Sequence, residues 1–127
     1  MKNEYALNLL NQIEQLPENW NENGAKHFSS ILIEKCKNYL FLLEKEPFVS
    51  PTACGTIQFE YDKENGDYLE FEISETKVLG YICTMQNGEH AFEIKDEDAI
   101  DKINEMVVKF FNECSGNRRL SWQLFKI

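Results

Sequence analysis

Two short stretches, IQFEYD at residues 57–62 and YLEFEI at residues 68–73, decide the fold. In each of them apolar side chains alternate with polar or ionised ones, which indicates a β-strand with one buried and one solvated face. The intervening KENGD at 63–67 is rich in turn-forming residues. We therefore predict an antiparallel hairpin. Its buried face would carry Ile57, Phe59, Tyr61, Leu69, Phe71 and Ile73.

A second hairpin is predicted from residues 78–86 and 89–95, which flank an Asn-Gly pair. Asn87 and Gly88 would supply the two positive-φ positions of a type I′ turn. Gln86 would then pair with Glu89, and this register predicts which side chains lie on each face. Tyr81, Cys83, Met85, His90, Phe92 and Ile94 would face the core, and Val78, Gly80, Ile82 and Thr84 would face solvent.

Apolar residues at helical spacing predict three helices around this sheet. The first covers about 4–16, and the second covers about 29–44 with Ser29 or Ser30 as its N-cap. The third begins after Asp96 or Asp98 and ends before Gly116. The inward residues predicted for the second helix are Phe28, Ile31, Leu32, Cys36, Tyr39, Leu40 and Leu43. Those predicted for the third are Ile100, Ile103, Val107, Phe110, Phe111 and Cys114.

The element order is thus α-α-β-β-β-β-α, which predicts an α+β fold: a four-stranded antiparallel meander with the helices packed on one face. The proline-flanked segment 47–51 is interpreted as a connector between helices and sheet. Residues 1–116 would form a single domain. Residues 117–127 would form a tail, either a fifth strand or cover for its own domain, or an interaction segment that pairs with another chain.

The chain has 127 residues and a formal net charge of −9, from 22 acidic and 13 basic residues. This charge opposes binding to nucleic acid or to an anionic membrane and favours a protein partner with a basic surface. It could also serve only to keep a small domain soluble. No apolar run approaches the about 20 residues of a membrane helix. Four cysteines without close pairs predict reduced thiols in a cytoplasmic protein.

Several short patterns in the first half of the chain occur together. They are Leu16-Pro17, WNENGA at 20–25, Pro47 with Pro51, and GTIQFEY at 55–61. Over roughly the first 75 residues the chain resembles a loosely defined family of small bacterial and mobile-element proteins of unknown function. It departs from that family's pattern at Asn21 and Cys54, where the family has Asp, and at Tyr61, where it has Trp. The resemblance implies a gene of the kind found in mobile elements, sometimes near toxin or defence genes, and supplies no active site.

The solvent face of the predicted sheet is the best candidate for a binding surface. Glu60, Glu70, Glu72 and Glu93 would place carboxylates on it, and Tyr68 and Ile82 would be anchors within a polar rim. Such a face would attract a partner rich in Lys and Arg. The alternative is a solvated face whose acids only oppose association between sheet edges.

Catalytic, metal and cofactor sites are not indicated. His27 and His90 are the only histidines, and the cysteines and histidines lack the spacing of a metal site. The scattered glycines form no phosphate-binding loop. A nucleophile at Cys54 would need His27 or His90 within reach and a third group to orient the base. These patterns favour a protein that is not an enzyme and holds no cofactor.

The tail is unusual, because Leu120, Trp122 and Leu124 alternate behind two arginines. Trp122 is of a residue type that often dominates interfaces. We therefore treat it as a candidate partner-binding residue.

Three hypotheses follow for function. The first is an acidic interaction module that occludes a basic partner, as an immunity, antitoxin or anti-defence protein would. The second is a small-molecule-binding or hydrolytic domain with a pocket near Trp20 and Cys54. The third is a structural homodimer joined through the tail.

Overall fold

The computed structural model describes residues 2–112, except the side chain of Asp96, and they form three helices and a five-stranded antiparallel sheet. The helices are α1 (Glu4–Glu14), α2 (Ser30–Leu42) and α3 (Ala99–Asn112), with a short 3₁₀ turn, η1 (Asp96–Asp98), before α3. The strands are β1 (Phe48–Pro51), β2 (Ile57–Asp62), β3 (Tyr68–Ile73), β4 (Lys77–Thr84) and β5 (Gly88–Lys95). The fold class is therefore α+β, as predicted.

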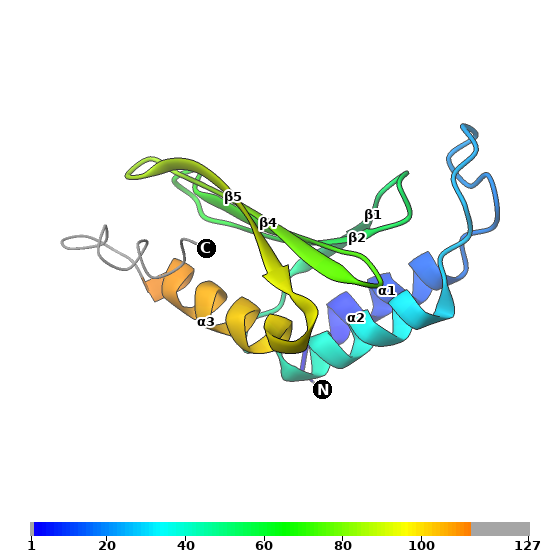
Figure 1. Ribbon diagram of the computed structural model, residues 1–127, viewed down its shortest axis with the longest axis horizontal. Coiled ribbons are helices and arrows are strands. Elements are labelled where there is room, and N and C mark those ends of the chain that lie inside the picture. Colours follow the sequence, from blue (N-terminus) through cyan, green and yellow to red (C-terminus); the bar gives the residue numbers. More distant parts are fainter. Residues whose placement is uncertain (1, 113–127) are drawn as a thin grey trace.

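The sheet is a meander in which every strand pairs with its sequence neighbours, in the order β1-β2-β3-β4-β5. All three helices lie on one side of it, and the other side is uncovered (Figure 1). We call this uncovered side the outer face. The loop between α1 and α2, residues 17–28, rises away from the helix layer (Figure 1). Among residues 2–112, no helix is long and apolar enough to cross a bilayer.

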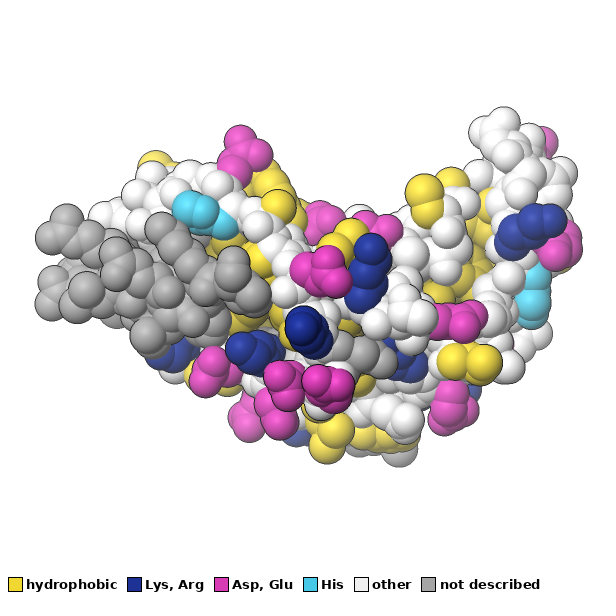
Figure 2. Space-filling model, viewed as in Figure 1, with side chains coloured by type: hydrophobic (Ala, Val, Ile, Leu, Met, Phe, Trp, Pro, Cys, Tyr) yellow, Lys and Arg dark blue, Asp and Glu magenta, His cyan; other side chains and the backbone are white. Residues whose placement is uncertain are grey.

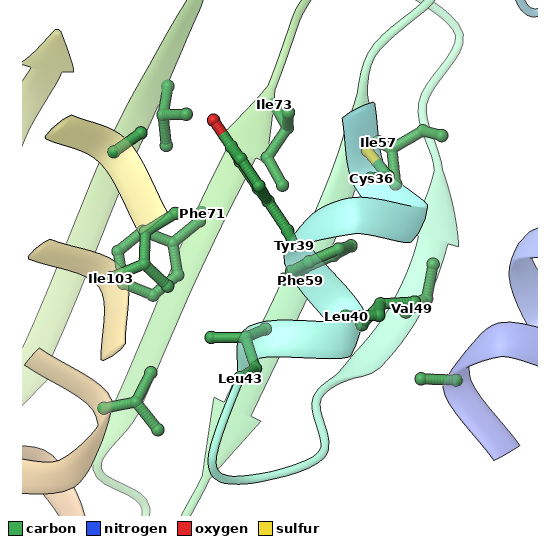
Figure 3. Packing of buried hydrophobic residues seen from close by; sticks show 14 of the residues in the cluster. Cys36, Tyr39, Leu40, Leu43, Val49, Ile57, Phe59, Phe71, Ile73 and Ile103 are labelled. Atoms are coloured by element: carbon green, nitrogen blue, oxygen red, sulfur yellow. The ribbon is translucent and has the colours of Figure 1, made fainter. Parts of the chain in front are cut away.

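One hydrophobic cluster joins the helices to the inner face of the sheet. In Figure 3, Tyr39 and Leu40 of α2 lie against the sheet side chains Phe59 and Val49, and Ile103 of α3 lies beside Phe71. The predicted β2–β3 hairpin is confirmed, since its six predicted core residues are all buried. Burying a large apolar side chain contributes about 1.5–3 kcal/mol, so this cluster is the main source of stability.

The prediction of four strands is wrong, because residues 48–51 form a strand rather than a connector. In β1, Phe48 pairs with Glu60 and Pro51 with Ile57, so that β1 is an edge strand of the sheet. The segment has only four residues and ends in proline, which cannot donate to a ladder and is tolerated at an edge. Alternation cannot be recognised over so short a length. The pairing with β2 is what makes it a strand.

The predicted phase of β4 is also wrong. The turn has three residues, Met85 to Asn87, and Thr84 pairs with Gly88. Gly88 has a φ of 70°, whereas Asn87 is not among the residues with positive φ. A three-residue loop followed by a left-handed glycine differs from a type I′ turn, which has two central residues of positive φ. Because the register shifts by an odd number of residues, Val78, Gly80, Ile82 and Thr84 are buried and Leu79, Tyr81 and Cys83 lie on the outer face.

Side chains around the turn explain this register. The side-chain oxygen of buried Thr84 accepts a hydrogen bond of 3.0 Å from the backbone N–H of Asn87. A carboxylate oxygen of buried Asp67, in the β2–β3 turn, accepts one of 3.0 Å from the backbone N–H of Met85. Farther along β4, a Cβ atom on Gly80 would lie 2.1 Å from the ring of Phe92, so the ring occupies the space above this glycine. The bond between Asp67 and Met85 thus ties the turns of the two hairpins together.

The helices largely agree with their predictions. The hydroxyl of Ser29 accepts a 3.1 Å hydrogen bond from the N–H of Leu32 and caps α2, as predicted. Ile31 was expected to face inward but is 65% exposed, and Ile33 is buried instead. At 3.6 residues per turn both lie about 100° from Leu32, on opposite sides of it, so packing decides which is covered. Gly116 and Cys114 lie outside the described residues, as does the whole predicted tail.

Candidate functional site

The outer face brings together side chains from all five strands. Residues paired across an antiparallel sheet share a face, with Cβ atoms about 4.5–5.5 Å apart. Three rows of the outer face follow from the observed register. They are Asp62-Tyr68-Cys83-Glu89, Phe48-Glu60-Glu70-Tyr81-Ala91 and Ser50-Gln58-Glu72-Leu79-Glu93.

The central carboxylates accept hydrogen bonds from neutral donors. Glu60 accepts one of 2.8 Å from the hydroxyl of Ser50. Glu70 accepts one of 2.7 Å from the hydroxyl of Tyr68 and one of 3.1 Å from the side-chain amide of Gln58. Glu72 accepts one of 2.7 Å from the Thr56 hydroxyl. These bonds orient the carboxylates without cancelling their charge.

Among residues 2–112, no lysine or arginine forms an ion pair with Glu60, Glu70 or Glu72. Glu60 and Glu70 are direct cross-strand partners, an arrangement that destabilises a sheet when both are charged. Two lysines, Lys77 and Lys95, do lie on the outer face, but they face one another at the start of β4 and the end of β5. Negative potential therefore concentrates at the opposite end, around Glu60 and Glu70, which we call the acidic end.

Two tyrosines border the acidic end. The rings of Tyr68 and Tyr81 lie 6.3 Å apart between centroids and are tilted by 56°. Burial, the hydrogen bond to Glu70 and the charges of Glu70 and Glu60 raise the pKa of Tyr68 above its ordinary range. A 2.7 Å hydrogen bond to Glu89 is the main cause that raises the pKa of Tyr81 to about 12. Both hydroxyls therefore stay protonated at neutral pH, and the rings provide apolar surface.

A depression of about 290 Å³, which we call the corner pocket, adjoins the acidic end. Its lining combines aromatic rings with carboxylates: Tyr5, Glu46, Pro47, Phe48, Glu60, Tyr61, Asp62 and Phe111. The upper surface of the molecule is hollowed between two raised parts, and Asp and Glu side chains gather in the hollow (Figure 2).

The corner pocket is built on crossed helix caps. Glu46 accepts a 2.9 Å hydrogen bond from the backbone N–H of Ala6 in the first turn of α1. The side-chain amide of Asn3, just before α1, donates bonds of 2.6 and 3.0 Å to the carbonyls of Leu40 and Leu43 at the end of α2. Helix ends leave such groups without partners, so these contacts satisfy them and hold the helices against β1.

Most of the predicted binding residues lie together. Glu60, Tyr68, Glu70 and Glu72 are neighbours on β2 and β3 of the outer face, and Glu93 lies on the same face at the edge strand β5. Ile82 was predicted to be an anchor there. That prediction is wrong, because Ile82 lies in the core and is only 4% exposed. Trp122 lies outside the described residues.

Among the outer-face residues that sequence reasoning missed are Phe48, Leu79 and Tyr81. Phe48 is 52% exposed and Leu79 is 38% exposed, so both present apolar surface beside the carboxylates. Phe48 was hidden by the interpretation of 47–51 as a connector. The other two were placed in the core by the one-residue error in β4, although the isolated glycine within the strand was a signal of a close contact on its face.

Residues 2–112 hold no cluster of three or more potential metal ligands. Burial raises the pKa of the Cys36 thiol to about 12, so this thiol is protonated and inert at neutral pH. Cys54 is exposed, and no hydrogen bond among the described residues joins it to His27 or His90, which contact the carbonyls of Leu16 and Asn87. A pocket shared by Trp20 and Cys54 stays a hypothesis.

Comparison of the chain with protein-family models, with curated proteins and with solved structures found no match in any of the three. The functional argument therefore rests on the outer face itself.

Proposed function

We propose that the chain is a non-enzymatic interaction module that binds a basic protein partner through the outer face of its sheet and occludes the partner's working surface. The observation that supports this most is the Glu60–Glu70 pair, in which two carboxylates lie side by side and form no ion pair with any lysine of residues 2–112. A Lys or Arg side chain from a partner would relieve their repulsion. This repulsion destabilises the free chain, so its relief would add to the free energy of binding.

The surroundings of this pair fit a protein interface. Phe48 and Leu79 offer apolar area next to the carboxylates, and Tyr68 and Tyr81 add aromatic rings between them. Apolar anchors surrounded by a polar rim are typical of interfaces. Charge speeds the encounter with an oppositely charged partner, and the anchors slow dissociation.

The acidic balance of the chain favours a protein over a nucleic acid, because phosphates would be repelled. We extend the proposal to an immunity, antitoxin or anti-defence role, in which occluding a basic surface is itself the activity. The resemblance to mobile-element proteins is consistent with this role and assigns no residue to it.

A capture experiment with matched variants tests the proposal. The immobilised wild-type chain, the outer-face variant Glu70→Gln/Glu72→Gln and the control Asp101→Asn/Glu105→Gln are incubated with a lysate of the native host. The control also removes two negative charges, but from exposed positions on α3. We expect one partner to be retained by the wild type and the control, and its recovery to fall at least about tenfold with the outer-face variant.

Ionic strength provides the second arm. Binding that depends on these carboxylates should weaken when salt rises from about 50 to about 500 mM, since exposed charges are screened. Equal loss with both variants, or retention that is unaffected by salt, would contradict the proposal.

A further inference from the structure

The corner pocket differs from the outer face that it adjoins, because aromatic rings form much of its lining. Phe48 and Tyr61 come from neighbouring strands, Tyr5 from the first turn of α1 and Phe111 from the end of α3. Tyr61 and Phe111 pack edge to face, with centroids 5.8 Å apart. A volume of about 290 Å³ is at the lower limit for drug-sized ligands, and it suits a single side chain better.

A cation already lies against one of these walls. The amino group of Lys45 is 5.3 Å from the centroid of the Phe111 ring, within cation–π distance. Lys45 is not among the residues that line the corner pocket. The Phe111 ring therefore already makes a favourable contact with a positive charge.

Carboxylates complete the lining. Glu60 and Asp62 are two residues apart on β2 and both point to the outer face. Glu46, which precedes β1, is bonded to the first turn of α1. Burial, and to a lesser extent the charge of Glu46, raise the pKa of Tyr61 above its ordinary range. The hydroxyl of Tyr61 donates a 2.8 Å hydrogen bond to the carbonyl of Lys45, so it is fixed in place.

We propose that the corner pocket receives an arginine side chain of the basic partner, stacked between aromatic rings and held by Glu60 and Asp62. This inference rests on the proposed function and specifies its anchor. Arginine fits better than lysine because the guanidinium is flat, stacks on aromatic faces and is less strongly hydrated than an ammonium. Its several N–H donors can also reach two carboxylates at once.

Peptide titrations followed residue by residue in NMR spectra test the choice of side chain. The probes are three decapeptides in which glycine alternates with arginine, lysine or citrulline, the last a neutral isostere of arginine. We expect the arginine peptide to bind at least about fivefold more tightly than the lysine peptide and to shift the amide signals of Phe48 and Asp62. The citrulline peptide should not bind measurably.

Variants locate the preference. Tyr5→Ala/Asp62→Asn removes one ring and one charge from the corner pocket, and Phe41→Ala/Asp101→Asn is a matched control. Tyr5 is 59% exposed and Phe41 is 53% exposed, and both acids are exposed, so neither pair disturbs the core. The preference for arginine over lysine should disappear in the pocket variant. It should persist in the control and in Glu70→Gln/Glu72→Gln.

The outcomes separate this inference from the proposed function. Equal binding of the arginine and lysine peptides by the wild-type chain would overturn the proposal that the corner pocket receives arginine. This outcome is decided without any variant. If partner capture still fell with Glu70→Gln/Glu72→Gln, the proposed function would stand without it. If instead the arginine preference mapped to the corner pocket while capture ignored the outer-face variant, the pocket would stand and the proposed partner surface would fall.

Discussion

The two hairpins of the sheet, β2–β3 and β4–β5, are built on different physical terms. In β2–β3 one face is wholly apolar and the other carries carboxylates, so only one orientation keeps the charges in water. In β4 apolar residues point both ways, with Val78 and Ile82 inside and Leu79 and Tyr81 outside. Burying either set would be favourable by a similar amount of free energy. The orientation of β4 therefore depends on its turn and on shape, through Gly80 and Phe92.

The comparison teaches that an apolar strand is held by its neighbours rather than by its own pattern. A change on the inner face of β4 should be costly, and the same type of change on its outer face should not. Four predictions examine how this strand is held, in order of decreasing expected effect.

Ile82→Ala should have the largest effect. Ile82 is 4% exposed, and truncating a buried isoleucine to alanine removes about 2–5 kcal/mol from the free energy of unfolding. Leu79→Ala, on the outer face at 38% exposure, should cost less than about 1 kcal/mol. Urea unfolding of both variants measures the difference. Equal losses, or a larger loss for Leu79→Ala, would show that β4 has the opposite orientation.

Gly80→Ala should destabilise the fold by about 1–3 kcal/mol, because the added methyl group overlaps the Phe92 ring. The double variant Gly80→Ala/Phe92→Ala tests the cause. If the ring is the obstacle, the two effects should not add, and the double variant should be more stable than the sum of the single losses predicts. Thermal unfolding in parallel with urea unfolding checks this. If the two losses of stability simply added, contact with the Phe92 ring would not be the reason that residue 80 must be glycine.

Asp67→Ala should cost about 1–2 kcal/mol, since it removes the acceptor that Asp67 provides to the Met85 N–H. The control Glu64→Ala lies in the same turn but is exposed, and should change stability by less than about 0.5 kcal/mol. Hydrogen exchange at the amide of Met85 supplies a local measurement. Unchanged protection there in Asp67→Ala would argue against a link between the two turns.

The smallest effect concerns Tyr81. Its pKa of about 12 lies above the ordinary value of 10.0, so its contribution to stability is complete below pH 10 and is lost as pH rises toward 12. In Glu89→Gln the main cause is removed, and the pKa should fall toward 10. Ultraviolet titration of the tyrosinates, compared with Tyr81→Phe, assigns the signal. An unchanged titration in Glu89→Gln would mean that Tyr81 does not lie beside Glu89 on the outer face.

Much of the candidate site could be predicted because it lies on β2 and β3. The carboxylates Glu60, Glu70 and Glu72 were assigned to the uncovered face by alternation with buried aromatic and aliphatic residues. The aromatic half of the site could not be predicted in the same way. Phe48 belongs to a strand that exists only through its pairing, and Tyr81 to a strand whose two faces are equally apolar.

The corner pocket was beyond prediction for a related reason. It joins Tyr5, Phe48 and Phe111, which are far apart in the chain, and no local pattern connects them. Their meeting depends on the way Asn3 and Glu46 tie α1 to the end of α2 and to the start of β1. Such long-range hydrogen bonds follow from packing and leave no periodic trace.

The residue order by itself determined the α+β class, the three helices and the faces of β2 and β3, because burying a charge without a partner is prohibitively costly. The tertiary structure alone decided the strand at 48–51, the phase of β4 and the corner pocket. In these places the competing arrangements bury similar apolar area, so the outcome depends on contacts between distant residues. Gly80 against Phe92 and Asp67 against Met85 are the contacts that make the choice in β4.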